Sequence, residues 1–68
     1  MISYELLWKT MKKKKISQYY LLKSGIETKT LDTLKKNKNV TLLTVEKLCH
    51  ILNCTPNEVV EFVDGDEN

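Results

Sequence analysis

The 68-residue sequence contains no arginine, only two glycines, one proline and two cysteines. The absence of arginine excludes bidentate guanidinium contacts to phosphate, carboxylate or guanine. Two cysteines without a secretion signal argue against a disulfide scaffold. No apolar run is long enough to cross a membrane, and the N-terminus lacks the charged-then-apolar pattern of a signal peptide. We therefore expect a cytoplasmic protein.

Charge is distributed unevenly along the chain. Residues 1–38 hold ten of the eleven lysines and three carboxylates, a formal charge of +7, whereas residues 39–68 hold one lysine and six carboxylates, a formal charge of −5. A basic surface beside an acidic segment is typical of nucleic-acid binders. Lysines that are simply solvated explain the same composition equally well, the Lys12–Lys15 run included.

Hydrophobic periodicity predicts an all-α fold in one compact domain. The domain spans residues 1–68, with its core at about 4–63 and an acidic tail at 64–68. Five helices are predicted, at about residues 4–12, 18–24, 26–36, 42–52 and 56–63. Helix starts are indicated at Ser3 (with Ile2 packing on the first turn), Ser17, Thr41 and the Thr55-Pro56-Asn57-Glu58 capping box. No segment has a convincing strand pattern.

The stretch Gly25–Lys36 is predicted to form a tight turn and a short helix. Leu31 and Leu34 face inward at a spacing of three. On a helical wheel the opposite side carries Lys29, Thr33 and Lys36, with Thr28 and Asp32 flanking. A short helix with a lysine and threonine face suits a groove lined with phosphates better than it suits catalysis.

Other residue patterns are best explained by packing. Tyr4, Trp8 and Met11 lie on one face of the first helix, and Leu42, Val45, Leu48, Cys49 and Leu52 form a stripe on the fourth. Cys49, His50 and Cys54 lie close in sequence, but Cys49 and His50 diverge on the helix and no CxxC pair exists. We therefore expect no metal and no cofactor. The sequence also offers no catalytic set, and we expect no enzyme.

The order of these features resembles the Cro/CI-type (lambda-repressor-like) helix-turn-helix family, in its small single-domain branch. The matching residues run through almost the whole chain: Ile16-Ser17-Gln18-Tyr19, Gly25-Ile26, Thr30-Leu31, Leu34, Val40-Thr41, Thr44-Val45, Leu48-Cys49, Leu52-Asn53-Cys54, Pro56 and Val59-Val60-Glu61-Phe62.

The resemblance implies a five-helix DNA-binding domain in which the second and third helices form the helix-turn-helix. It implies base contacts from Thr28, Lys29, Asp32 and Thr33. It implies phosphate contacts from Ser17, Gln18, Lys36, Asn37, Lys38 and Asn39. Two departures leave alternatives open. Gln18 to Gly25 is one residue shorter than usual, so helix 2 is either shorter or shifted in register. Glu27 stands where serine or threonine usually caps the third helix, and Thr28 is the alternative cap.

The resemblance favours a bacterial or phage transcriptional regulator that binds double-stranded DNA at an operator, acting as a repressor. Leu43, Ile51 and Phe62 are candidates for a homodimer or partner surface, although they also suit a small core. We expect no small-molecule ligand. The alternative is a protein-interaction module that keeps the fold, either neutralising a toxin or modulating another regulator. RNA binding is a third, weaker hypothesis.

Overall fold

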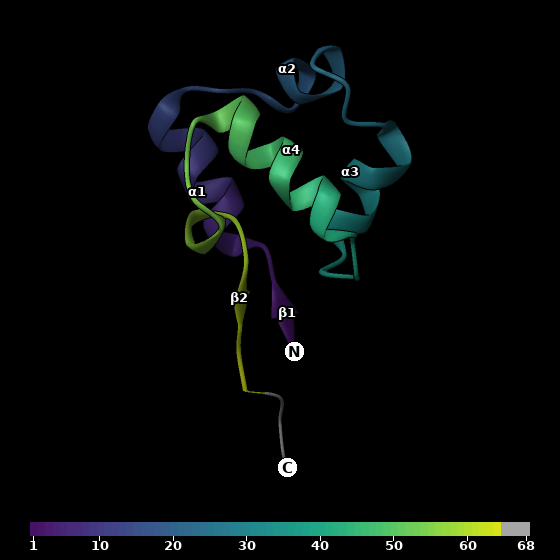
Figure 1. The fold of residues 1–68 in the computed structure, drawn as a ribbon, viewed down its shortest axis with the longest axis vertical. Coiled ribbons are helices and arrows are strands. Elements are labelled where there is room, and N and C mark those ends of the chain that lie inside the picture. Colours follow the sequence, from purple (N-terminus) through teal and green to yellow (C-terminus); the bar gives the residue numbers. More distant parts are fainter. Residues whose placement is uncertain (65–68) are drawn as a thin grey trace.

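Four α-helices form most of the computed structural model, which describes residues 1–64. The order is β1 (Ile2–Ser3), α1 (Glu5–Lys14), α2 (Gln18–Lys23), α3 (Thr28–Lys35), α4 (Leu42–Leu52), the 3-10 turn η1 (Pro56–Glu58) and β2 (Glu61–Phe62). Figure 1 shows α4 running between α1 and α3, with α2 joining them across one end. Most of the predicted acidic tail, residues 65–68, lies outside the described residues. No helix in residues 1–64 is long and apolar enough to span a membrane.

The buried hydrophobic side chains form one cluster to which every α-helix contributes. Its members are Tyr4, Leu7, Met11, Leu21, Ile26, Leu31, Leu34, Val45, Leu48, Leu52 and Val59. Trp8 and Cys49 pack against it while half-buried. Burial of these side chains supplies the main stabilising term for a domain of this size. The predicted core of α1, α3 and α4 is therefore confirmed, except at one position.

That exception is Leu42, which was predicted on the core stripe and is 87% exposed. Thr41 caps α4, since its Oγ1 accepts a hydrogen bond from the Thr44 amide at 3.1 Å. Leu42 is consequently the first helical residue. Its side chain therefore lies beyond the end of the core, although a helical wheel places Leu42 on the same side of the helix as Val45 and Leu52.

Several predicted helix boundaries are confirmed by backbone geometry. The Ser17 side chain caps α2 by accepting from the Tyr20 amide at 3.1 Å. Gly25 follows α2 with φ of 110°, and Asn53 ends α4 in the left-handed conformation with φ of 53°. The predicted cap of the first helix is wrong. Ser3 lies in β1, and Tyr4 is the N-cap of α1 without a side-chain capping bond.

The predicted fifth α-helix is also wrong. The Thr55 capping box forms, but it starts only the three-residue turn η1. The chain then extends into β2, which pairs antiparallel with β1 in the register Ile2 with Phe62. Three valines among residues 59–63 favour extended backbone, and the two chain ends complete the ladder through bonds between Met1 and Val63 of 2.7 and 2.8 Å. The fold is therefore mostly helical, with a short two-stranded ribbon that the sequence did not indicate.

Candidate nucleic-acid interface

The helix α3 has one buried edge and one exposed polar face. Leu31 and Leu34 are 5% and 0% exposed and anchor the helix in the core. Thr28, Lys29 and Asp32 are exposed, as the helical wheel predicted. This face presents hydroxyl, ammonium and carboxylate groups within one and a half turns of helix. Such groups can donate to and accept from base edges.

Thr33, also predicted on this face, is more enclosed than its neighbours. It is half-buried, and its hydroxyl donates to the Lys29 carbonyl oxygen at 3.0 Å. A threonine hydroxyl that donates within its own helix can still accept a hydrogen bond. In this conformation the Thr33 hydroxyl can accept a hydrogen bond, but its own proton is already engaged.

The start of α3 settles which residue is its cap. Glu27 is the N-cap, with extended backbone and no capping bond from its side chain, and Thr28 is the first helical residue. The Gly25 conformation and the bond from the Ile26 amide to the Leu21 carbonyl (3.0 Å) close the turn in front of it. Thr28 is therefore not the cap, and its side chain is exposed at the N-terminal end of the helix.

The N-terminus of α2 is the second part of the candidate interface. The helix α2 has six residues, and its first residue, Gln18, is exposed. Ser17 is also exposed, and its hydroxyl oxygen accepts from the Tyr20 amide. Because a hydroxyl has one proton to donate in addition, Ser17 can cap α2 and donate to a phosphate at once.

The loop between α3 and α4 is the third part. Lys36, Asn37, Lys38 and Asn39 are all exposed. Two of these residues are tied to the core by Tyr4. The Tyr4 amide donates to Asn37 Oδ1 at 2.9 Å, and the Tyr4 hydroxyl donates to the Lys38 carbonyl at 2.7 Å. Asn37 itself is left-handed, with φ of 55°. Sequence reasoning assigned Tyr4 to the core and missed this contact. The need of a buried phenol for a partner was the signal available.

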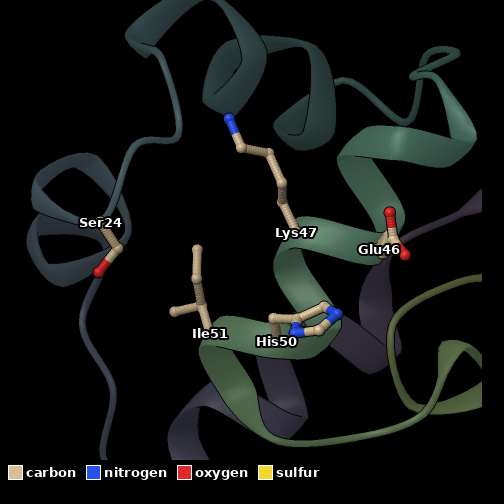
Figure 2. Close-up of a pocket in the computed structure, with 5 residues that line it drawn as sticks. All are labelled: Ser24, Glu46, Lys47, His50 and Ile51. Atoms are coloured by element: carbon tan, nitrogen blue, oxygen red, sulfur yellow. The ribbon is translucent and has the colours of Figure 1, made fainter.

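An open hollow of about 350 Å³ lies between the α2–α3 turn and α4, lined by Ser24, Glu46, Lys47, His50 and Ile51 (Figure 2). Lys47 extends from α4 toward the turn, where its Nζ is 3.5 Å from the Gly25 carbonyl oxygen. Glu46 and His50 lie along the same helix, as the close-up shows. Lys47, the one lysine of residues 39–68, thus links α4 to the turn between α2 and α3 across this hollow.

Cys49 and Cys54 are free and half-buried at the C-terminal end of α4. Burial raises the pKa of both thiols, and the neighbouring Cys49 helps to raise the pKa of Cys54 to about 11. Both thiols are consequently protonated at physiological pH. Within residues 1–64, no three histidine, cysteine or acidic side chains gather closely enough to hold a metal ion.

The predicted partner surface is divided between two parts of the molecule. Leu43 on α4 is 65% exposed and Phe62 on β2 is 85% exposed, whereas Ile51 packs partly against the core.

The exposed aromatic Tyr19 on α2 lies under the Lys23 ammonium, which is 5.5 Å from the ring centroid. The side chains of Lys12 to Lys15 are exposed around the C-terminus of α1.

A small helical domain with a two-helix turn and an exposed polar helix is the arrangement found in helix-turn-helix DNA-binding domains. The model of the Cro/C1-type helix-turn-helix DNA-binding domain matches residues 6–65, and the chain belongs to this family. The crystal structure of the transcriptional regulator VanUg, form II, is similar at a TM-score of 0.82 and 31% identity, over 88% of this chain and 81% of that chain. A comparison with curated proteins finds no match. The helix-turn-helix prediction is confirmed, with α2 and α3 as its helices.

Proposed function

We propose that this domain is a transcriptional regulator that binds a specific double-stranded DNA site and represses by occupying it. In this proposal α3 lies in the major groove, and Thr28, Lys29, Asp32 and Thr33 contact base edges. The name of the similar solved structure, a transcriptional regulator, supports the regulatory part. Occupancy of an operator is sufficient for repression, because it excludes other proteins from the same DNA.

The observation that carries the proposal is the grouping of exposed polar residues around α3. Its exposed face carries Thr28, Lys29 and Asp32, and its other edge is fixed by buried Leu31 and Leu34. The α2 N-terminus and the loop that follows α3, which precede and follow this helix in the chain, are exposed as well. Segments on either side of a groove-bound helix are placed to contact the two phosphate backbones. The charge of +7 on residues 1–38 supports the same face.

Phosphate contacts are assigned to the flanking segments. Lys36 and Lys38 supply charge, and Ser17, Gln18 and Asn39 supply neutral donors. Asn37 has its side-chain oxygen engaged with Tyr4, so only its NH₂ group is free for a phosphate. Each neutralised phosphate releases counterions, which makes the affinity depend on salt.

Base recognition proceeds without arginine in this chain. Lys29 can donate to the O6 and N7 acceptors of guanine as a single ammonium, and threonine can contact either kind of base. An ammonium lacks the rigid fork of a guanidinium. Each base contact is therefore expected to discriminate modestly, and specificity is expected to come from several contacts.

Duplex binding over a series of salt concentrations tests the proposal. Fragments of the chain's own promoter region are compared with unrelated duplexes of the same length. The proposal predicts preferential binding to one promoter fragment, with log K falling against log salt at a slope of about −0.9 per neutralised phosphate. Equal binding to all duplexes, or binding that salt does not weaken, contradicts it.

A protein-interaction module is the second candidate function. The exposure of Leu43 beside exposed Leu42, and of Phe62 beside exposed Val63, favours it, because contiguous exposed apolar area can mark a partner surface. In this role α3 is not a working surface. This candidate is supported against the first if the chain purifies as a stable complex with a second protein and the Lys29→Ala variant forms that complex as the wild type does.

A further inference from the structure

We propose that Tyr4 is a positioning residue for DNA binding, which fixes the loop after α3 so that Lys36, Lys38 and Asn39 meet the phosphate backbone. This inference rests on the proposed function. It adds a residue that does not itself touch DNA.

The contacts are made by one buried residue with two successive loop residues. Tyr4 is 1% exposed, and it lies 33 and 34 positions before the residues that it binds. Its amide donates to the Asn37 side chain and its hydroxyl donates to the Lys38 carbonyl, at 2.9 and 2.7 Å. Both the side chain of one loop residue and the backbone of the next are thus held against the core.

The first part of the loop is a closed helix end. Asn37 takes the left-handed conformation that asparagine adopts at helix C-termini, and its amide and that of Lys38 bond back to the Leu34 and Thr33 carbonyls at 3.1 Å each. These bonds close the C-terminus of α3, and the two bonds from Tyr4 tie the same residues, Asn37 and Lys38, to the core. Without the phenol, the Lys38 carbonyl loses its partner in a partly buried bond and the loop loses this attachment.

The segment that carries Tyr4 is itself held in place. Tyr4 follows β1 directly, and β1 pairs with β2 from the other end of the chain (Figure 1). Ser3 pairs with Glu61 in this ladder. The ribbon at the chain ends therefore fixes the backbone from which Tyr4 reaches the loop.

A fixed loop lowers the cost of binding DNA. A mobile loop must be ordered when its lysines meet phosphates, and that ordering subtracts from the affinity. Lysine side chains remain flexible, but their reach is set by where the backbone holds them. Tyr4 keeps that backbone in one conformation before DNA arrives.

The test compares Tyr4→Phe with Thr10→Val. Thr10 is also buried, and its hydroxyl donates to the carbonyl of Glu58 at 2.8 Å. Glu58 is the last residue of η1 and does not belong to the loop between α3 and α4. Each variant removes one hydroxyl that donates to a backbone carbonyl. Duplex affinity is measured against salt at a temperature where circular dichroism shows both variants folded. Tyr4→Phe is expected to weaken binding about fivefold and to reduce the salt slope by about one, while Thr10→Val keeps the wild-type slope.

Amide hydrogen exchange supplies a readout that does not require DNA. Tyr4→Phe is expected to speed exchange at Asn37 and Lys38 while α1 and α4 keep their protection. If Tyr4→Phe fails to fold, Asn37→Gly replaces it with loop exchange in the absence of DNA as the readout, since glycine keeps the positive φ but removes both the bond to the Tyr4 amide and the NH₂ group assigned to phosphate. That variant is expected to speed exchange at Lys38, and wild-type exchange there would overturn the positioning role.

The outcomes separate this inference from the function on which it rests. A wild-type chain that binds no duplex overturns both. Wild-type affinity, salt slope and loop exchange in Tyr4→Phe overturn the positioning role and leave the proposed function intact. Equal losses in Tyr4→Phe and Thr10→Val, with unchanged salt slopes, assign Tyr4 to stability alone and also overturn the inference.

Discussion

The Lys36 ammonium lies 3.1 Å from the Asp32 carboxylate, one helical turn apart at the C-terminal end of α3. A residue assigned to phosphate is therefore paired with one assigned to bases. Both side chains are more than half exposed, and such a pair stabilises a helix by only about 0.3–0.5 kcal/mol. A DNA phosphate can replace the carboxylate at small cost. Before binding, the pair neutralises part of the positive charge at this end of α3, which also carries Lys35.

Replacing Asp32 with asparagine tests this arrangement. We expect Asp32→Asn to tighten binding to unrelated duplexes, where Asp32 makes no specific base contact, by about two- to fivefold at low salt, because it removes a negative charge near phosphates and frees Lys36. Fluorescence anisotropy with a labelled unrelated duplex measures the change. Glu5→Gln is the matched control, since Glu5 is an exposed carboxylate in the first turn of α1. Equal gains in the two variants would show that only net charge matters.

Gly25 should be required by its backbone conformation and not by space. Its φ is 110°, and a Cβ built there would meet only the Lys47 ammonium, at 4.0 Å. Gly25→Ala is expected to lower the free energy of unfolding by about 1–2 kcal/mol, measured by urea denaturation. Ser24→Ala, at the preceding residue with φ of −90°, should change it by less than about 0.5 kcal/mol. A Gly25→Ala variant as stable as wild type would contradict this reason for glycine.

The thiol of Cys54 predicts a stability change in alkaline solution. Burial and the adjacent Cys49 raise its pKa from 9.0 to about 11, so the folded chain holds this proton more tightly than the unfolded chain. The resulting stability is complete below pH 9 and is lost as the pH rises through about 11. We expect the free energy of unfolding to fall over this range, and to fall less steeply in Cys54→Ala. Identical pH profiles for the two proteins would show that Cys54 does not contribute.

Self-association should depend on Phe62 or Leu43, if these residues form the surface between two copies. We expect sedimentation equilibrium to show a dimer that Phe62→Ser or Leu43→Ser converts to monomer, because either change removes exposed apolar area. Tyr19→Ser is the control, since Tyr19 is similarly exposed on α2. A wild-type chain that is monomeric at every concentration rules out a homodimer. These side chains would then be left for a different partner.

The helices and their capping residues could be predicted because their signals are local. Ser17, Thr41 and Asn53 act within a few residues of their positions, and Leu31 and Leu34 are placed by helical period. The exposed face of α3 followed from the same period. Its division into base and phosphate contacts stays a prediction.

The features that could not be predicted join distant parts of the chain. The pairing of Ile2 with Phe62 and the contact of Tyr4 with Asn37 span 60 and 33 positions, and no local pattern indicates either. Strands of two residues show no alternation. Pro56 and Glu58 correctly predicted a helical start, but the helix ends after the single turn η1, and the chain becomes extended at Glu61 and Phe62 in a segment rich in valine.

The most direct test of the proposed function separates base contacts from phosphate contacts. Lys29→Ala and Lys36→Ala remove the same charge from the same helical face, so each is the control for the other. Affinities are measured for the preferred promoter duplex and for an unrelated duplex. Lys29→Ala is predicted to lower the ratio of the two affinities by about 5- to 100-fold, while Lys36→Ala weakens both and leaves the ratio unchanged. A Lys29→Ala variant that keeps the wild-type ratio would contradict the assignment of α3 to sequence recognition.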